Sequence, residues 1–152
     1  MRKIEGLFAD YASHHQTSGN KICHRIGIPL IVFSLFGLLQ KGTLLTSSRG
    51  HLDGAMLLIA ASTIYYLTLE VRLAVMMLIV SVAMYEVALH VAWPVHLALF
   101  VIGWILQFIG HGTFEKRRPA FLRNFVHLLI GPLWILNDVL HVVPDTPVPV
   151  AE

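Results

Sequence analysis

Apolar residues gather into five runs along the chain, separated by polar or Gly- and Pro-containing breaks. The runs cover roughly residues 26–40, 54–69, 73–92, 95–110 and 125–143. Each run is rich in Leu, Val, Ile and Ala and carries almost no charge. In hydrocarbon, only a helix satisfies all its backbone hydrogen-bonding groups within one segment. The pattern therefore predicts five helices, although several runs are shorter than the ~20 residues that a vertical bilayer crossing needs.

The composition favours a membrane protein over a soluble one. Of the 152 residues, 56% are hydrophobic and 13% are charged, against about 45–50% and about 25% in soluble domains. This balance excludes a disordered chain and a nucleic-acid-binding domain, so no nucleic-acid partner is expected. Because Cys23 is the only cysteine, an intrachain disulfide and a multi-cysteine metal site are excluded as well. We expect one membrane-embedded domain over 1–152, an all-α helical bundle with about five transmembrane helices.

Basic residues predict which side of the membrane each loop occupies. With five crossings, the N-terminal segment 1–25, the turn at 70–72 and the loop 112–124 share one side. Nine of the 11 basic residues then lie on that side: Arg2, Lys3, Lys21, Arg25, Arg72, Lys116, Arg117, Arg118 and Arg123. Lys and Arg accumulate in cytoplasmic loops, so the N-terminus and the basic loop are predicted to be cytoplasmic. The Pro-rich end 144–152 is predicted to be a loose tail.

Nine histidines are unusual in so apolar a chain, and the predicted topology sorts them into two groups. The cytoplasmic group contains His14, His15, His24, His111 and His127, and the outer group contains His51, His90, His96 and His141. Neutral imidazole is a common protein ligand for zinc, iron, copper and nickel. Three separate segments bring imidazoles to the cytoplasmic surface, which favours a metal site there. The alternative is that these histidines are amphipathic residues at the headgroup level.

A rival group of ionisable residues is predicted in the outer half of the membrane. Glu86 and His90 are four residues apart on the third run, and Asp138 and His141 are three apart on the fifth. Ionisable residues inside a membrane are costly and often functional. They are either structural pairs or the lining of a path in a non-enzymatic metal or proton carrier.

Several motifs resemble those of the 2-hydroxy-fatty-acid dioxygenase family, known in yeast from phytosphingosine breakdown. The N-terminal part of the resemblance consists of Tyr11, His14-His15, Asn20, His24 and Gly27-Ile28-Pro29. The later part consists of Gly103-Trp104, the block QFIGHGTFEKRRPA at 107–120, and Gly131-Pro132. The motifs follow one another in order over nearly the whole chain, and the QFIGHGTFEKRRPA block is the most specific of them.

The resemblance implies an Fe(II)-dependent, O₂-using enzyme that shortens long-chain 2-hydroxy fatty acids by one carbon. It implies metal ligation by His14, His15, His24 and His111, with Glu115 orienting His111 or anchoring a basic neighbour. Candidates to hold the substrate carboxylate are Lys21, Arg25, Arg117 and Arg118. The run of basic residues at 116–118 is also suited to anionic membrane lipids.

Two further expectations follow from the same residues. The acyl tail would stay among membrane lipids, in a bacterial inner membrane or an endoplasmic-reticulum membrane, with the metal site on the cytoplasmic side. A lipid hydroxylase or desaturase is the enzymatic alternative, but those enzymes use more histidines, in His-x-x-His clusters. In this chain only His14-His15 comes close to such a cluster.

Overall fold

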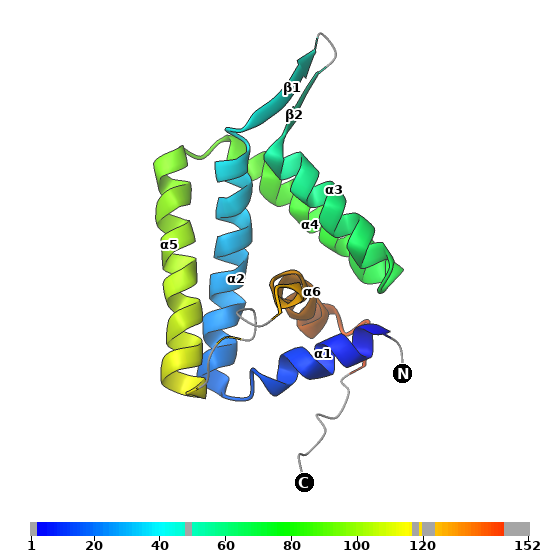
Figure 1. The fold of residues 1–152 in the computed structure, drawn as a ribbon, viewed down its shortest axis with the longest axis vertical. Helices are drawn as coiled ribbons and strands as arrows, with labels where there is room; N and C mark the ends of the chain where they lie inside the picture. The colour runs from blue at the N-terminus through cyan, green and yellow to red at the C-terminus, as the bar shows by residue number, and fades with distance from the viewer. Residues whose placement is uncertain (1–2, 48–49, 117–118, 120–123, 145–152) are drawn as a thin grey trace. The chain divides into compact units, whose positions relative to one another are not determined.

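The computed structural model describes residues 3–47, 50–116, 119 and 124–144, and the chain in these ranges is mainly helical (Figure 1). The helices are α1 Lys3–Ser13, α2 Ser18–Leu39, α3 Gly54–Leu67, α4 Val71–Leu89, α5 Trp93–Ile109 and α6 Val126–Leu140. A π-helical turn, η1 Gly110–Glu115, continues α5. Each of the five predicted apolar runs lies largely in one of the helices α2 to α6.

Three of these helices are long and apolar enough to cross a membrane. They are Ser18–Leu39, Val71–Leu89 and α5 with η1, Trp93–Glu115. The apolar helices α3 and α6 are shorter, with 14 and 15 residues. Large apolar side chains are exposed along the long helices, among them Ile79 on α4 and Val101 and Ile105 on α5. Such exposed apolar faces are typical of helices that contact lipid, whereas the predicted number of five crossings stays a prediction.

Residues 41–53 depart from the all-α expectation because they contain an antiparallel hairpin. Strand β1 Thr43–Ser47 pairs with β2 Gly50–Asp53, with Leu45 opposite Leu52 and an irregularity between Thr43 and Leu45. The segment is rich in Thr and Leu and too polar to continue the helix before it, so short strands replace a simple loop. Gly50 has a φ of 151°, which favours glycine at the start of β2.

The chain forms two compact units. The first contains Met1–Ile28 and Trp104–Glu152, and the second contains Pro29–Gly103. In the second unit, α3 packs against α4, with Phe36, Ala55, Ile59 and Tyr85 at the centre of the apolar core. The buried Asp53 caps α3 by accepting from the Met56 amide at 2.9 Å, and it also accepts a 2.7 Å hydrogen bond from the Tyr85 hydroxyl. This carboxylate therefore ties the end of the hairpin to both helices.

In the first unit, α1 packs against α6. Helix α1 was not predicted from the apolar runs, since its segment is polar overall. Its buried residues Ile4, Phe8 and Tyr11 are spaced four and three apart, which places them on one face of a helix. This face turns the N-terminal segment into a packed element, and the chain leaves it at Ser13, two residues before the first buried histidine.

Candidate metal centre

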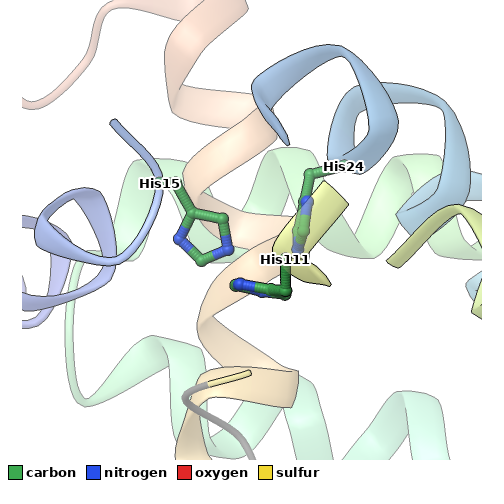
Figure 2. Close-up of side chains that lie close together, drawn as sticks. All are labelled: His15, His24 and His111. Atoms are coloured by element: carbon green, nitrogen blue, oxygen red, sulfur yellow. The ribbon is translucent and has the colours of Figure 1, made fainter. Parts of the chain in front are cut away.

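Three buried imidazoles converge in the first unit (Figure 2). His15 lies between α1 and α2, His24 is on α2, and His111 is on η1. One nitrogen from each ring lies within 4.8 Å of the others. The ring centroids are 4.3 Å apart for His15 and His24, 4.9 Å for His15 and His111, and 4.8 Å for His24 and His111. A single metal ion can therefore be reached by all three rings.

Backbone carbonyls set the tautomers of two of these rings. Nδ1 of His15 donates to the Tyr11 carbonyl at 2.6 Å, and Nδ1 of His24 donates to the Asn20 carbonyl at 2.9 Å. Because a carbonyl can only accept, the proton of each neutral ring is on Nδ1 and the lone pair is on Nε2. This is the arrangement of a metal-binding histidine, whose other nitrogen is oriented by a hydrogen bond.

Unpartnered nitrogens provide an independent test of whether a metal fits. Nε2 of His15 and Nδ1 of His111 are buried and have no hydrogen-bond partner. A buried polar atom without a partner costs free energy, and metal coordination would remove that cost. Burial, followed by the neighbouring His24, lowers the pKa of His15 to about 3 from its ordinary value of 6.5. His15 is therefore neutral at physiological pH, the form that binds metal.

Gly110 explains how His24 and His111 come together. A Cβ atom at this position would overlap the side-chain oxygen of Asn20 and would lie 3.1 Å from Cβ of Cys23. Only glycine allows this close packing of η1 against α2. The next residue, His111, is thereby held against the turn of α2 that carries His24. Local π-helical geometry of this kind is frequent at functional sites.

Glu115 fastens the end of η1 to the start of α2. Its carboxylate accepts from the amides of Gln16 and Thr17 at 3.0 and 3.2 Å, from the Thr17 hydroxyl at 2.9 Å, and from the Asn20 side chain at 3.1 Å. A carboxylate at a helix N-terminus is also favoured by the helix dipole. Among the described residues, the hydrogen bonds of Glu115 thus hold the segment between His15 and His24.

His14 differs from its neighbour and is not one of the three converging residues. Its Nδ1 lies 2.9 Å from the Asp10 carbonyl and 3.1 Å from the Ser13 hydroxyl, and its side chain is 35% exposed. Its ring meets His127 edge to face with 5.6 Å between centroids. Three of the four predicted ligands are therefore brought together by the fold.

The predicted carboxylate-binding residues have different surroundings. Arg25 on α2 forms a 2.6 Å ion pair with Asp138 on α6. Lys21 is half-buried on α2, and Arg117 and Arg118 lie outside the described residues. The ion pair of Arg25 also neutralises Asp138, one member of the rival group. It places Asp138 beside the start of α2, at the end predicted to be cytoplasmic, so the predicted position of Asp138 in the outer half of the membrane is not compatible with this contact.

The other members of the rival group are not arranged as a buried path. Glu86 and His90 are exposed on the second unit. His141 is exposed at the end of α6. The predicted pairs Glu86–His90 and Asp138–His141 are thus not the buried clusters that a carrier of ions would need.

Several residues near the centre were given no individual role in the sequence analysis. Tyr11 stacks on the His15 ring with 4.0 Å between centroids, and Trp134 lies 6.5 Å from it. His127 contacts Asp10 through a 2.9 Å hydrogen bond. The spacing of four between Tyr11 and His15 was available in the sequence as a signal. The contacts of α6 with α1 join residues more than a hundred positions apart, and no local pattern indicates them.

Comparison with known proteins shows the family of the chain. The family model described as "2-hydroxy-palmitic acid dioxygenase Mpo1-like" matches residues 1–143. The chain belongs to the Mpo1-like family. It is 32% identical over 131 residues to the 2-hydroxy-palmitic acid dioxygenase MPO1 of Saccharomyces cerevisiae. The aligned region covers 86% of this chain and 75% of the yeast protein. No solved structure gives a significant match. The resemblance inferred from the histidine motifs and the QFIGHGTFEKRRPA block is confirmed.

Proposed function

We propose that this member of the Mpo1-like family is an Fe(II)-dependent dioxygenase that shortens long-chain 2-hydroxy fatty acids by one carbon. The observation that carries the proposal is the convergence of three buried imidazoles, each of which offers one nitrogen to a metal ion. The name of the yeast relative supports the choice of substrate class and reaction. The side-chain ligands proposed are His15, His24 and His111.

The donor set suits iron that must also bind substrate. Three imidazoles leave open coordination positions, which an O₂-using iron site requires. When bound, Fe(II) would supply electrons to O₂ and Lewis acidity toward the carboxylate and hydroxyl of the substrate. The overall change, RCH(OH)COO⁻ + O₂ → RCOO⁻ + CO₂ + H₂O, balances without an external reductant.

The protein's own residues hold and orient these groups. The Tyr11 and Asn20 carbonyls fix the lone pairs of His15 and His24 toward the metal position. Glu115 keeps the ligand-bearing start of α2 against η1. Lys21 remains a candidate for the substrate carboxylate, together with Arg117 and Arg118, which also suit lipid headgroups.

The apolar helices and the charge pattern support a proposal for the location of the centre. We place the centre at the cytoplasmic face of a bacterial inner membrane or an endoplasmic-reticulum membrane, with the acyl tail among membrane lipids. Each CH₂ group gains about 0.8 kcal/mol of free energy when it leaves water for either lipid or a protein interior. The acyl tail therefore gains little when it moves from the membrane to the enzyme. Substrate selection would then depend on the carboxylate and the 2-hydroxyl, not on chain length.

Oxygen consumption by the purified, iron-loaded protein tests the proposal. We expect turnover of 2-hydroxy acids of several long chain lengths, and none of 3-hydroxypalmitate or palmitate. A hydroxyl at carbon 3 enlarges the chelate ring, and palmitate lacks the hydroxyl altogether. Comparable oxygen consumption with palmitate would instead favour a lipid hydroxylase. Turnover of 2-hydroxypalmitate without O₂, or with zinc in place of iron, would overturn the proposal.

A further inference from the structure

His127, near the start of α6, is a buried polar residue with one unused nitrogen. Its side chain is 7% exposed. Nε2 lies 2.9 Å from a carboxylate oxygen of Asp10 on α1. Nδ1 is buried and has no hydrogen-bond partner. Buried polar groups in proteins nearly always have partners, so this nitrogen is available to a bound group.

The face of α6 that carries His127 lies beside the metal centre. Tyr11 connects the two, because its ring stacks on His15 at 4.0 Å and lies 5.9 Å from the His127 ring. One turn after His127, a Cβ at Gly131 would lie 3.0 Å from the Tyr11 hydroxyl, so the glycine allows α6 to approach closely. Further along this face, Trp134 lies 6.5 Å from His15. This face of α6 therefore forms a wall next to the ligand His15.

The substrate brings a group that needs such a partner. A 2-hydroxy acid that chelates a metal uses its hydroxyl and one carboxylate oxygen, which leaves the other carboxylate oxygen free. A buried anionic oxygen without a donor is strongly unfavourable. Among the candidate basic residues, Arg25 is already paired with Asp138 at 2.6 Å. A donor on the face of α6 beside His15 would meet this need for the oxygen that points to that side.

Asp10 prepares His127 for this role. The hydrogen bond to Asp10 fixes the direction of the ring and so the direction of Nδ1. An imidazole that carries hydrogen on both ring nitrogens can donate to two carboxylates at once. Both ring nitrogens then donate, one to Asp10 and one to the substrate, in charge-assisted hydrogen bonds.

We propose that His127, oriented by Asp10, binds the free carboxylate oxygen of the 2-hydroxy fatty acid at the metal centre. The proposal rests on the proposed function and adds a substrate-binding residue to it. His127 touches the substrate, and Asp10 acts through His127 as a positioning residue. Neither residue belongs to the converging histidines.

Anaerobic binding of two ligands tests the proposal. The probes are 2-hydroxypalmitate and its methyl ester, which keeps the carbonyl and hydroxyl but replaces the charged oxygen with a methoxy group. Dissociation constants are measured by tryptophan fluorescence on the iron-loaded protein in detergent. We expect His127→Phe to weaken binding of the acid about tenfold or more and to leave the ester unchanged. Iron content should stay that of the wild type.

Matched variants separate binding from folding. His90→Phe makes the same substitution at an exposed residue of the other unit and should change neither dissociation constant. Asp10→Asn changes a half-exposed residue and should lower the preference for the acid severalfold. His127→Gln, whose side-chain amide can donate a hydrogen bond, should keep part of the preference for the acid over the ester that His127→Phe loses. If His127→Phe does not fold, the Asp10→Asn and His127→Gln variants carry the test.

Two results would overturn the proposal. Equal weakening of acid and ester would show that His127 only maintains the shape of the site. Unchanged binding of the acid in both His127→Phe and Asp10→Asn would show that the carboxylate binds elsewhere, with an ordered water on Nδ1. The proposed function fails separately, if wild-type protein binds the acid but consumes no oxygen with it.

Discussion

At the scale of single residues, two adjacent histidines provide the sharpest contrast. His15 is 2% exposed and has a free nitrogen facing His24 and His111, whereas His14 is half-exposed and bonds to its own helix. We expect His15→Ala to lower turnover of 2-hydroxypalmitate by at least about 100-fold, because loss of a ligand exceeds the effect of losing its supporting residues. His14→Ala should retain activity within about tenfold, since it removes only a neighbour of the site.

Oxygen-electrode assays compare the turnover of His14→Ala and His15→Ala. His51→Ala, outside the first unit, is the control. Similar losses in His14→Ala and His15→Ala would contradict the assignment of ligands. The sequence alone could not separate the two histidines, because both precede α2 by a few residues. In both residues Nδ1 bonds to the carbonyl four positions back, but only the His15 ring is buried, with its Nε2 unpartnered.

Burial of His15 has a consequence for stability. Its pKa is lowered to about 3 in the folded chain, mainly by burial, against about 6.5 when unfolded. Between these values the unfolded chain binds a proton that the folded chain does not. Because of His15, the free energy of unfolding therefore falls as the pH is lowered from about 6.5 toward 3. Above pH 6.5 or so, His15 has no such effect on stability.

Thermal unfolding of the metal-free protein in detergent measures this effect. The wild type should lose thermal stability more steeply than His15→Phe between pH 6.5 and pH 4.5. Parallel pH profiles for the two proteins would show that His15 is not buried in its neutral form.

At the scale of elements, the centre depends on how η1 joins α2. Glu115→Gln keeps the shape of the side chain but removes the charge that four donors of Gln16, Thr17 and Asn20 share. We expect metal affinity to fall about 10- to 100-fold, the size of effect typical of groups that orient ligands. Competition with a calibrated chelator measures this affinity, and an unchanged value would rule out Glu115 as a support of the site.

Gly110→Ala tests the close packing of the same two elements. The added Cβ overlaps the Asn20 side chain, so η1 must shift away from α2, at a cost of about 1–3 kcal/mol in stability. We expect lower metal affinity as well as a lower unfolding temperature. Gly112→Ala is the control, since a Cβ there meets nothing within 4 Å. Equal affinities in both variants would contradict the packing argument.

The helices could be predicted far better than their contacts. Apolar runs located α2 to α6 because burial in lipid or in a core requires continuous apolar surface. The hairpin β1–β2 was missed because strands of five and four residues leave little periodic signal. Helix α1 was missed because its apolar stripe of Ile4, Phe8 and Tyr11 is narrow. The contact of His127 with Asp10 was not predicted because the two residues are 117 positions apart.

At the scale of the whole molecule, the arrangement in the membrane is open to direct measurement. Single cysteines at Lys3, Leu45 and Lys116, in a Cys23→Ala background, occupy exposed positions. They lie before the first predicted crossing, between the first and second, and between the fourth and fifth. Because basic residues accumulate on the cytoplasmic side, Lys3 and Lys116 should be labelled from the cytoplasm and Leu45 from the opposite side. Labelling of Lys3 and Lys116 from opposite sides would contradict the predicted topology.

The central claim is that His15, His24 and His111 together hold one iron ion. Anaerobic titration of the purified, metal-free protein with Fe(II) tests it most directly. The wild type should bind one equivalent per chain, His14→Ala should bind the same amount, and His24→Ala and His111→Ala should each bind far less at the same free iron concentration. One equivalent bound with wild-type affinity in His24→Ala and His111→Ala would show that the three imidazoles are not the metal site.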